Sequence, residues 1–444
     1  MKVMLRATLL AIIMLALQTG CSTPAPVGAS LPLSERIVAY GAADVVQHDA
    51  PGNGTLLNGE LGTRPFVLAI PANWTHETVL FGQGYSTPGS VPGVPSDPLA
   101  KDPSNGVLRY AYEQGVAVGI IAFDKAGVAT ESGVANTLAL RDLVSRLGGK
   151  QFYMVGGSMG GNVVIAMIEQ HPKAFAGAVS MCGVTEGWIS LVRQMMEMRA
   201  AYNLLAEETS YELPGEKDVT RSALPTVPPE GEARDGQTFR NAQTMRIIMP
   251  VVRLFQAAKA NPDGPEARIA RQVAAIGGFA DDPAAVAAPL YSGALGMDDI
   301  VATMGGLPAG NIGKTYAPPD MTDDEAARFN QRIQRFEASP AAIAYAQTWH
   351  EATGRFLIPL ITVHQRIDSL VPYSQSEAFG ARVAKAGNDA HLVQYAVSGT
   401  KMPIPGGLEG YAHCGFTPEQ NIGAFKVMRT WVQTGARPAP DAVK

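Results

Sequence analysis

The chain has 444 residues, more than a usual single domain, so its length predicts one large domain with an insertion or two domains. Hydrophobic residues make up 46% and charged residues 17%, a balance that is typical of a folded globular protein and excludes a disordered chain. With 35 Lys and Arg against 40 Asp and Glu, the net charge of -5 excludes the broad basic surface of a nucleic-acid-binding protein.

The N-terminal segment has the layout of a signal peptide. Two basic residues precede an apolar run at 7–17, which is too short to span a bilayer. Residues 17–21, Leu-Gln-Thr-Gly-Cys, resemble a bacterial lipobox, whose cysteine becomes the lipidated first residue after cleavage, although this pattern prefers an aliphatic residue at Gln18. We therefore expect an exported outer-membrane or periplasmic lipoprotein, attached to a membrane only through lipid on Cys21. A plain secreted protein cut before Ser30 is the alternative.

The next part of the chain alternates strands with helices. Apolar runs at Phe66–Ile70 and Thr78–Phe81 predict two antiparallel strands. From residue 107 to 181, buried strands and helices alternate, which predicts βαβ units in a mostly parallel sheet. The elements expected there are helices at 107–114, 132–147 and 162–170 and strands at 116–123, 152–155 and 176–181.

The alternation stops between residues 186 and 355, where helical patterns continue without a convincing buried strand. Helices are expected at 188–206, 240–260, 265–276, 323–337 and 340–353. A strand at 356–363, a helix at 375–386, a strand at 392–397 and a last helix at 418–434 follow. The sequence thus predicts a signal peptide at 1–20, a tether and N-terminal extension at 21–60, an α/β core at 61–185 and 356–444, and a helical cap or lid insertion at 186–355.

A nucleophile motif lies between the strand at 152–155 and the helix after it. Residues 156–160 read Gly-Gly-Ser-Met-Gly, and the small residues let the chain turn sharply and present Ser158 at the edge of the sheet. The first N–H groups of the following helix point to the place where an oxyanion would develop. We expect Ser158 to be a nucleophile; a Gly-rich turn that only packs closely or binds phosphate is the alternative.

A serine hydroxyl is a weak nucleophile until a histidine takes its proton, and that histidine needs a carboxylate to fix its orientation. After the returning strand, the loop at 362–372 carries Asp368 ahead of apolar residues and a proline. After the last strand, a turn-rich loop at 410–418 carries His413. We expect Asp368 to be the acid and His413 the general base. Asp368 as a turn cap is the alternative, and Glu186 is the reserve acid.

These motifs, in this order, resemble the α/β-hydrolase superfamily over about residues 63–181 and 356–434. The resemblance implies a mostly parallel central sheet flanked by helices, with a mainly helical cap inserted between the two parts. The expected fold class is therefore α/β.

The resemblance also implies two backbone donors for the oxyanion. One is the N–H of Met159, the residue after the nucleophile. The other comes from residues 79–85, which resemble the family's strand ending in His-Gly and point to Tyr85. Gln83 replaces the usual histidine, which changes the hydrogen bonding of the loop but leaves the main-chain donor; a solvated turn residue is its alternative role.

Two cysteines flank the expected site. Cys182 ends the strand after the nucleophile helix, and Cys414 directly follows His413. In the family topology both positions lie at the catalytic edge, so a disulfide that pins the histidine loop is one hypothesis, and two buried free thiols are the other. The tannase and feruloyl-esterase group also places a cysteine after its histidine, but its partner cysteine precedes the nucleophile, where this chain has Gly157.

The remaining motifs are weaker. His364 lies near a strand end and could line the pocket, Asp124 is expected to stabilise a turn, and most other histidines are expected at the surface. Residues 313–315 mimic the end of a phosphate loop, but the required first glycine falls at Pro308. No spacing of His, Cys or carboxylates indicates zinc, so no cofactor or metal is expected.

The resemblance implies acyl transfer to water from a carboxylic ester, either a small molecule or a polymer. Large apolar residues of the insertion would suit a bulky or hydrophobic substrate or form the core of the lid: Trp188, Met195, Met196, Met198 and Trp349. A cap-bearing peptidase of the aminopeptidase type is the alternative, which an acidic cluster that captures a free amino terminus would favour. A third reading is a non-catalytic binding lipoprotein that kept the fold. The sequence indicates no oligomeric state.

Overall fold

The structure, a computed structural model, describes residues 31–232 and 235–443. The expected signal peptide at 1–20, Cys21 and most of the tether lie outside the described residues. Within the described ranges, no helix combines the length and the apolar composition needed to cross a membrane.

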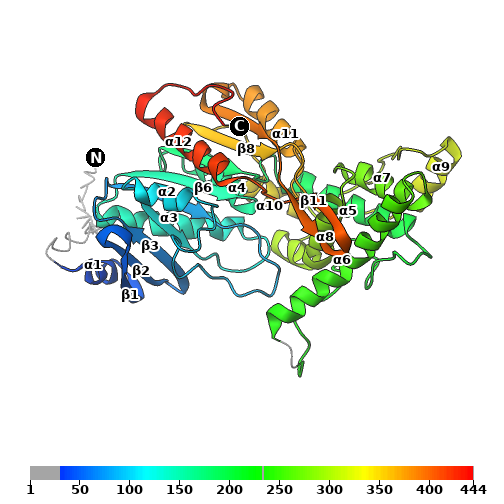
Figure 1. The fold of residues 1–444 in the computed structure, drawn as a ribbon, viewed down its shortest axis with the longest axis horizontal. Helices are drawn as coiled ribbons and strands as arrows, with labels where there is room; N and C mark the ends of the chain where they lie inside the picture. Colours follow the sequence, from blue (N-terminus) through cyan, green and yellow to red (C-terminus); the bar gives the residue numbers. More distant parts are fainter. Residues whose placement is uncertain (1–30, 233–234, 444) are drawn as a thin grey trace, which may run out of the picture.

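A nine-stranded sheet forms the centre of the fold, in the order β1-β2-β3-β5-β4-β6-β7-β8-β9 (Figure 1). The strands are β1 (Ala42–Ala50), β2 (Gly54–Leu61), β3 (Arg64–Ile70), β4 (Glu77–Gly82), β5 (Ala117–Ile121), β6 (Gln151–Gly157), β7 (Gly177–Met181), β8 (Leu360–Gln365) and β9 (Leu392–Val397). Neighbours from β5 to β9 pair in parallel, whereas β1, β2 and β3 form an antiparallel edge. The expected α/β class with a mainly parallel sheet is thus confirmed.

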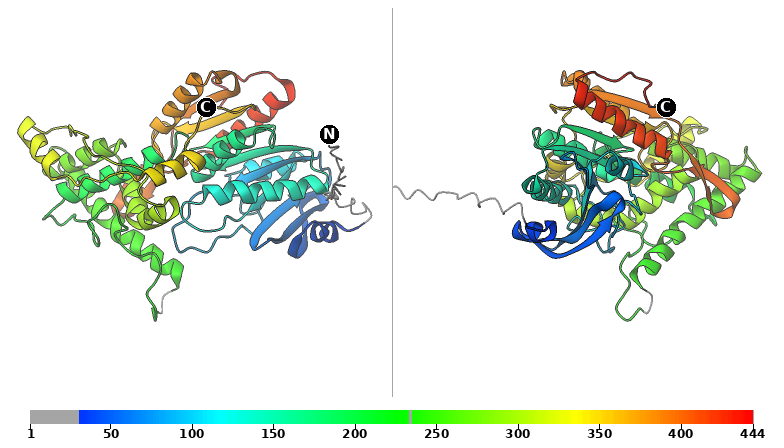
Figure 2. Two further views of the ribbon diagram at one scale, coloured as in Figure 1. Left: turned by 180° about the vertical axis from the view of Figure 1, so that it is seen from behind. Right: turned by 60° about the vertical axis from the view of Figure 1, so that its left-hand side comes forward.

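Helices cover both faces of the sheet, as the opposite views in Figures 1 and 2 show. One apolar core joins α2 and α12 to the sheet, and the other joins α3, α4 and α11 to the opposite face. The covering helices are α2 (Val107–Glu113), α3 (Thr130–Leu147), α4 (Met159–Gln170), α11 (Ser374–Lys385) and α12 (Pro418–Thr434). Because both faces are covered, the central strands are buried along their length, which explains their continuous apolar sequence.

The two strands expected to be antiparallel, β3 and β4, do run in opposite directions but are not neighbours in the sheet. Between them lies β5, which pairs antiparallel with β3 and parallel with β4. The helix α2 provides the crossover that lets the chain insert β5 beside β4.

The sheet also begins earlier than the expected start of the core at residue 61. Strands β1 and β2 occupy residues 42–61, within the segment that the sequence analysis assigned to the N-terminal extension. Most side chains of β1 are exposed, so this edge strand lacks the apolar alternation by which a half-buried strand is recognised.

Between β7 and β8, the chain leaves the sheet and forms a body of helices at one end of the core (Figure 1). These inserted helices are α5 (Trp188–Leu205), α6 (Gly236–Ala260), α7 (Pro265–Gly277), α8 (Pro283–Met304), α9 (Asp323–Arg332) and α10 (Pro340–Trp349). The sequence analysis missed α8, which contains Pro289 and is buried over much of its length, so it shows little of the polar face of an amphipathic helix.

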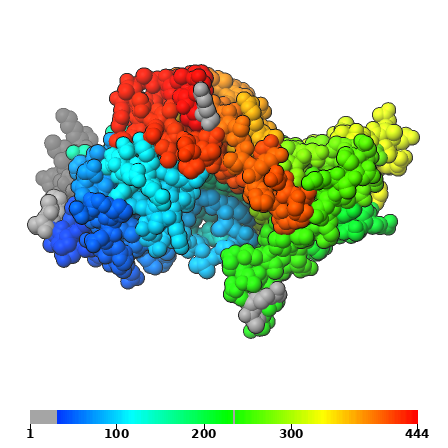
Figure 3. All heavy atoms as spheres, viewed as in Figure 1, coloured from blue at the N-terminus to red at the C-terminus, as the bar shows by residue number. Residues whose placement is uncertain are grey.

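A short hairpin connects the core to these helices. Its strands are β10 (Lys401–Ile404) and β11 (Leu408–Tyr411); β11 lies against α8 and the turn between the strands against α6, as the orange segment on the green helices in Figure 3 shows. The hairpin was not expected, because the side chains of β10 are mostly exposed and give no strand pattern. It ends two residues before His413 and so joins the inserted helices to the histidine loop, the loop at 410–418 that carries the expected base.

The carboxyl ends of the central parallel strands meet at one edge of the sheet. The strand β6 ends directly before Ser158, β7 ends directly before Cys182, and the loop after β8 carries Asp368. Parallel strands of an open α/β sheet present their following loops at the same edge, where ligands usually bind. The fold therefore brings the expected site residues to one place.

Candidate active site

Ser158 occupies a sharp turn between β6 and α4. Its backbone has φ 57 and ψ -124, a strained conformation for a residue that is not glycine. A Cβ atom on Gly156 would collide with the carbonyl oxygen of Gly160, and one on Gly160 would collide with that of Gly82. The two motif glycines are therefore required by close backbone contacts, and the turn presents the serine hydroxyl above the sheet, as expected.

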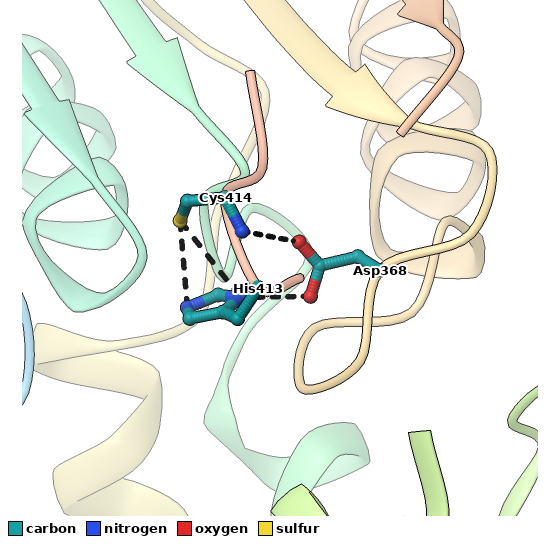
Figure 4. A group of neighbouring side chains, drawn as sticks. All are labelled: Asp368, His413 and Cys414. Carbon is teal, nitrogen blue, oxygen red and sulfur yellow. Dashed lines mark hydrogen bonds and ion pairs between the residues drawn. The ribbon is translucent and has the colours of Figure 1, made fainter. Parts of the chain in front are cut away.

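The structure brings Ser158, His413 and Asp368 into one hydrogen-bonded chain. Nε2 of His413 lies 2.8 Å from Oγ of Ser158, and Nδ1 lies 2.7 Å from Oδ1 of Asp368. A carboxylate can only accept, so Nδ1–H donates to Asp368 and Nε2 is left to accept the serine proton. Figure 4 shows Asp368 and His413 reaching one another from separate loops.

Asp368 is held as an anion by its surroundings. Its side chain is buried, and Oδ1 also accepts the N–H groups of Leu370 and Val371, each at 2.9 Å, while Oδ2 accepts the N–H of Cys414 at 2.9 Å. Burial alone would raise the pKa of Asp368, but the charge and hydrogen bond of His413 and the Cys414 amide bring this pKa below its usual value. The carboxylate can therefore orient the histidine and stabilise its protonated form.

A buried glutamine that the sequence analysis did not single out clamps the histidine loop. Gln365, at the end of β8, donates to the carbonyl of Ala412 at 3.2 Å and accepts the N–H of Gly415 at 2.8 Å. These two contacts lie on either side of His413, and Gln365 has no exposed surface. A strand-end glutamine carries no motif, so only the structure reveals this role.

Cys182 and Cys414 form a disulfide between the end of β7 and the histidine loop. The bond joins two residues that are 232 positions apart in sequence. Asp368, His413 and Cys414 also lie close enough together to suggest a metal site (Figure 4). This group does not fit a metal, because the Cys414 sulfur is bonded to Cys182 and both ring nitrogens of His413 already have partners.

Met159 and Tyr85, the residues expected to supply the oxyanion donors, are close to Ser158 in the structure. Met159 begins α4, and the first amides of a helix have no acceptor within that helix. Tyr85 follows β4 and lines the same cavities as Ser158, while a Cβ on Gly84 would lie only 3.8 Å from that of Ser158. Gln83, in place of the family's histidine, donates to the carbonyl of Ile121 at 3.1 Å and so fastens this loop to β5.

Two cavities open from Ser158. The apolar cavity, of about 30 Å³, reaches toward α5 and α8 and is lined by Val184, Trp188, Leu191, Met195, Ser292, Ile300, Leu370 and Val371. The polar cavity, of about 360 Å³, is lined by His413, the disulfide, Gln83, Pro103, Ser104, Asn105, Phe416 and Asn421 among others. Of the apolar cap residues singled out from sequence, Trp188 and Met195 line the apolar cavity, while Met196, Met198 and Trp349 line neither cavity.

The weaker candidates are not members of the hydrogen-bonded chain, although His364 lies close enough to Asp368 to help lower the pKa of that carboxyl. Glu186, the reserve acid, accepts from Ser190 and pairs with Arg382. Asp124 is bound to Arg64, and His364 is buried and bonds through Nε2 to a backbone carbonyl. These side chains therefore have structural partners elsewhere.

One histidine differs from the expectation of a surface position. His350 is buried beside the nucleophile helix, with Nδ1 3.4 Å from the side-chain oxygen of Asn162. Burial lowers the pKa of His350 to about 3, so this side chain remains neutral near neutral pH. Lack of a sequence motif therefore did not imply exposure.

Comparisons with known proteins agree with this architecture. A family model described as alpha/beta hydrolase fold matches residues 80–224, which include β4, Ser158 and β7. A search of curated protein sequences finds no match to the chain.

Solved structures with a similar course of the chain include an esterase and a lipase. Feruloyl esterase B from Aspergillus oryzae has 14% identity and a TM-score of 0.46, covering 90% of this chain and 86% of its own. Lipase A from Candida antarctica has 12% identity and a TM-score of 0.43, covering 94% of this chain and 90% of its own. At such identities the activity has to follow from the residues of the site. The strand order, the turn at Ser158 and the family match together show that the chain has the α/β-hydrolase fold.

Proposed function

We propose that this protein is a serine hydrolase that cleaves a carboxylic ester through an acyl-enzyme on Ser158. The observation that carries the proposal is the continuous chain of hydrogen bonds from Ser158 through His413 to Asp368. This arrangement gives a serine the adjacent base and the orienting carboxylate that nucleophilic catalysis requires.

The reaction runs in two steps. His413 takes the proton of Ser158 while Oγ bonds to the ester carbonyl, and the amides of Met159 and Tyr85 stabilise the resulting oxyanion. The C–O bond to the alcohol then breaks, and His413 returns the proton to the departing oxygen. Water, activated by His413, attacks the acyl-enzyme, releases the carboxylic acid and restores the Ser158 hydroxyl.

The lining of the cavities favours an ester over an amino-terminal peptide. A site that captures a free amino terminus needs a carboxylate, and no Asp or Glu lines either cavity within the described ranges. Two acidic residues of the insertion have partners of their own: Glu207 pairs with Arg332, and Glu325 pairs with Arg268. A binding lipoprotein without catalysis would have no need for the aligned hydrogen bonds around His413.

We also propose that the protein is exported and anchored through lipid on Cys21. The apolar run at 7–17 and the lipobox-like residues 17–21 support this proposal. Mass spectrometry of the protein extracted from bacterial membranes should find Cys21 as an acylated N-terminal residue. A mature chain that begins at another position without lipid would contradict the anchor.

The activity is tested with p-nitrophenyl esters and aminoacyl p-nitroanilides, using the protein without residues 1–21 and its Ser158→Ala variant. The proposal predicts ester hydrolysis that the variant lacks, with a loss of about 10³-fold or more. Hydrolysis of the anilides with no ester turnover would favour the peptidase. Ester turnover that survives in Ser158→Ala would contradict the assignment of the nucleophile.

A further inference from the structure

We infer that the substrate is an ester of a short, uncharged, apolar acid with a larger and more polar alcohol. The acyl group lies in the apolar cavity, and the alcohol lies in the polar cavity. This inference rests on the proposed ester hydrolysis and assigns each cavity one part of the substrate.

The reacting carbonyl has to lie where the two cavities meet. Ser158 and Tyr85 line both cavities, so Oγ and the proposed oxyanion donor stand at their junction. The carbonyl carbon has to lie within reach of Oγ, and the carbonyl oxygen has to lie near the Tyr85 amide. The two other substituents of this carbon then point in different directions. One substituent therefore enters each cavity.

The position of His413 decides which substituent enters which cavity. His413 lines the polar cavity but not the apolar cavity. In the proposed mechanism its Nε2, 2.8 Å from Oγ, has to deliver a proton to the oxygen of the departing alcohol. That oxygen must therefore lie on the His413 side, which places the alcohol in the polar cavity and leaves the apolar cavity to the acyl group.

The lining of the apolar cavity limits the acyl group. Aliphatic and aromatic side chains from α5, α8 and the loop after β8 dominate it, and no Lys, Arg, Asp or Glu lines it in the described part of the chain. A charged acyl group would lose its hydration without gaining a partner. At about 30 Å³ the cavity also lies far below the range of about 300–1,000 Å³ for ligand sites, so it has room only for a short acyl group. Met195 and Leu191 on α5, with Ile300 on α8, bound its depth.

The polar cavity suits a different group. At about 360 Å³ it is far larger than the apolar cavity, and amide and hydroxyl side chains, including Gln83, Ser104 and Asn105, form part of its wall. Asn105 holds a left-handed backbone with φ 52, and its side chain donates to the carbonyl of Phe416 at 2.9 Å. An alcohol that carries further hydroxyl groups can find hydrogen-bond partners here.

The first experiment measures kcat/KM for p-nitrophenyl esters from acetate to dodecanoate, together with the charged hemisuccinate. The inference predicts the highest value at short chains, a fall of about tenfold or more toward dodecanoate, and a hemisuccinate value far below that of the butyrate. Butyrate esters of glycerol and hexanol then compare a polar with an apolar alcohol, and the glycerol ester is expected to be preferred.

The Met195→Ala variant tests the assignment of the apolar cavity. Truncating Met195 should raise the ratio of octanoate to butyrate turnover about tenfold, since added methylenes gain buried space. Met196→Ala is the matched control, because Met196 is buried on the same helix but lines neither cavity. Ile300→Ala, on a different helix, repeats the test if Met195→Ala does not fold.

Three results would overturn the inference. The first is a ratio of octanoate to butyrate turnover that is equal in the Met195→Ala, Ile300→Ala and Met196→Ala proteins. The second is a wild-type preference for long or charged acyl groups. The third is a Met195→Ala protein whose preference among alcohols changes while its preference among acyl groups does not. If these occur while ester turnover still requires Ser158, only the assignment of the cavities fails. Absence of any turnover that requires Ser158 would overturn the proposed function together with this inference.

Discussion

The carboxylate of Asp282, at the N-terminus of α8, accepts the backbone N–H of Tyr411, with oxygen distances of 3.2 and 3.3 Å. Tyr411 lies two residues before His413 and ends the hairpin that rests on the inserted helices. The helix that carries Ile300 into the apolar cavity is therefore tied directly to the histidine loop. The inserted helices thus contribute to the position of the proposed base as well as to the cavity wall.

Replacing Asp282 with alanine should therefore lower kcat by about tenfold, because the histidine loop loses a fixed contact. The change also removes the cap of α8, which should cost about 1 kcal/mol of unfolding free energy. Asp235→Ala is the control, since Asp235 caps α6 by the same contacts and does not touch the histidine loop. Equal losses of kcat in the two variants would mean that losing a helix cap lowers kcat by itself, and that the contact of Asp282 with Tyr411 contributes nothing.

Gln365→Ala should lower kcat by about 10- to 100-fold while KM changes little. Gln365 bonds on both sides of His413 but lines neither cavity, so its loss disturbs the base and spares the substrate contacts. Gln394→Ala is the control, because Gln394 lies on the adjacent strand β9 and bonds to Ser376. Steady-state kinetics, measured beside thermal unfolding, separates a loss of activity from a loss of stability. A rise in KM with unchanged kcat would argue against a positioning role.

Asp368→Asn should reduce kcat by about 10³- to 10⁴-fold, because an amide cannot hold the histidine in the orientation and charge state that a carboxylate selects. Asp368→Glu is a useful comparison, since it keeps the charge but displaces it. Activity in Asp368→Asn close to that of the wild type would return the reserve acid, Glu186, to consideration.

The stability contributed by Asp368 should depend on pH in a defined direction. The pKa of Asp368 is lower in the folded protein than its ordinary value of 3.8, so the ionised carboxylate stabilises the fold. This contribution is fully present above the unfolded pKa and is lost as pH falls through the folded pKa. Denaturant unfolding of the wild type and Asp368→Asn should therefore give a difference that is constant near neutral pH and shrinks on acidification below about pH 4. A difference that grows on acidification would contradict the assigned ionisation.

Reduction of the Cys182–Cys414 disulfide should lower both stability and activity. The double variant Cys182→Ser with Cys414→Ser should lose about 2–4 kcal/mol of unfolding free energy, because a long loop is no longer closed. It should also lose part of its kcat, since Cys414 follows His413 directly. Mass spectrometry of the unreduced protein should find neither cysteine alkylated. Alkylation of both before reduction would show free thiols instead.

How far the sequence predicts this fold depends on the strength of each local pattern. The central strands were recognisable because burial on both faces leaves continuous apolar runs. The edge strand β1, the hairpin strand β10 and the buried helix α8 lack such periodicity, since their side chains are mostly exposed or mostly buried. The pairing of β3 with β5 depends on contacts distant in sequence and leaves no local signal.

The candidate site divides in the same way. Ser158, Asp368 and His413 stand in short motifs that the chemistry itself constrains, and the structure brings these three side chains together. Gln365 and Asp282 act through contacts with the backbone of the histidine loop, and such contacts constrain geometry without fixing a motif. Supporting residues of this kind can be found only once the chain is folded.

The most direct test of a reactive nucleophile is covalent labelling with a fluorophosphonate, followed by peptide mass spectrometry. The account predicts one modified residue, Ser158, because among the described residues only this hydroxyl lies beside both His413 and the proposed oxyanion amides. It also predicts that His413→Ala labels at least about 100-fold more slowly, since the serine then lacks its base. No labelling of the folded wild-type protein, or labelling at Ser158 that is as fast without His413, would contradict the catalytic chain.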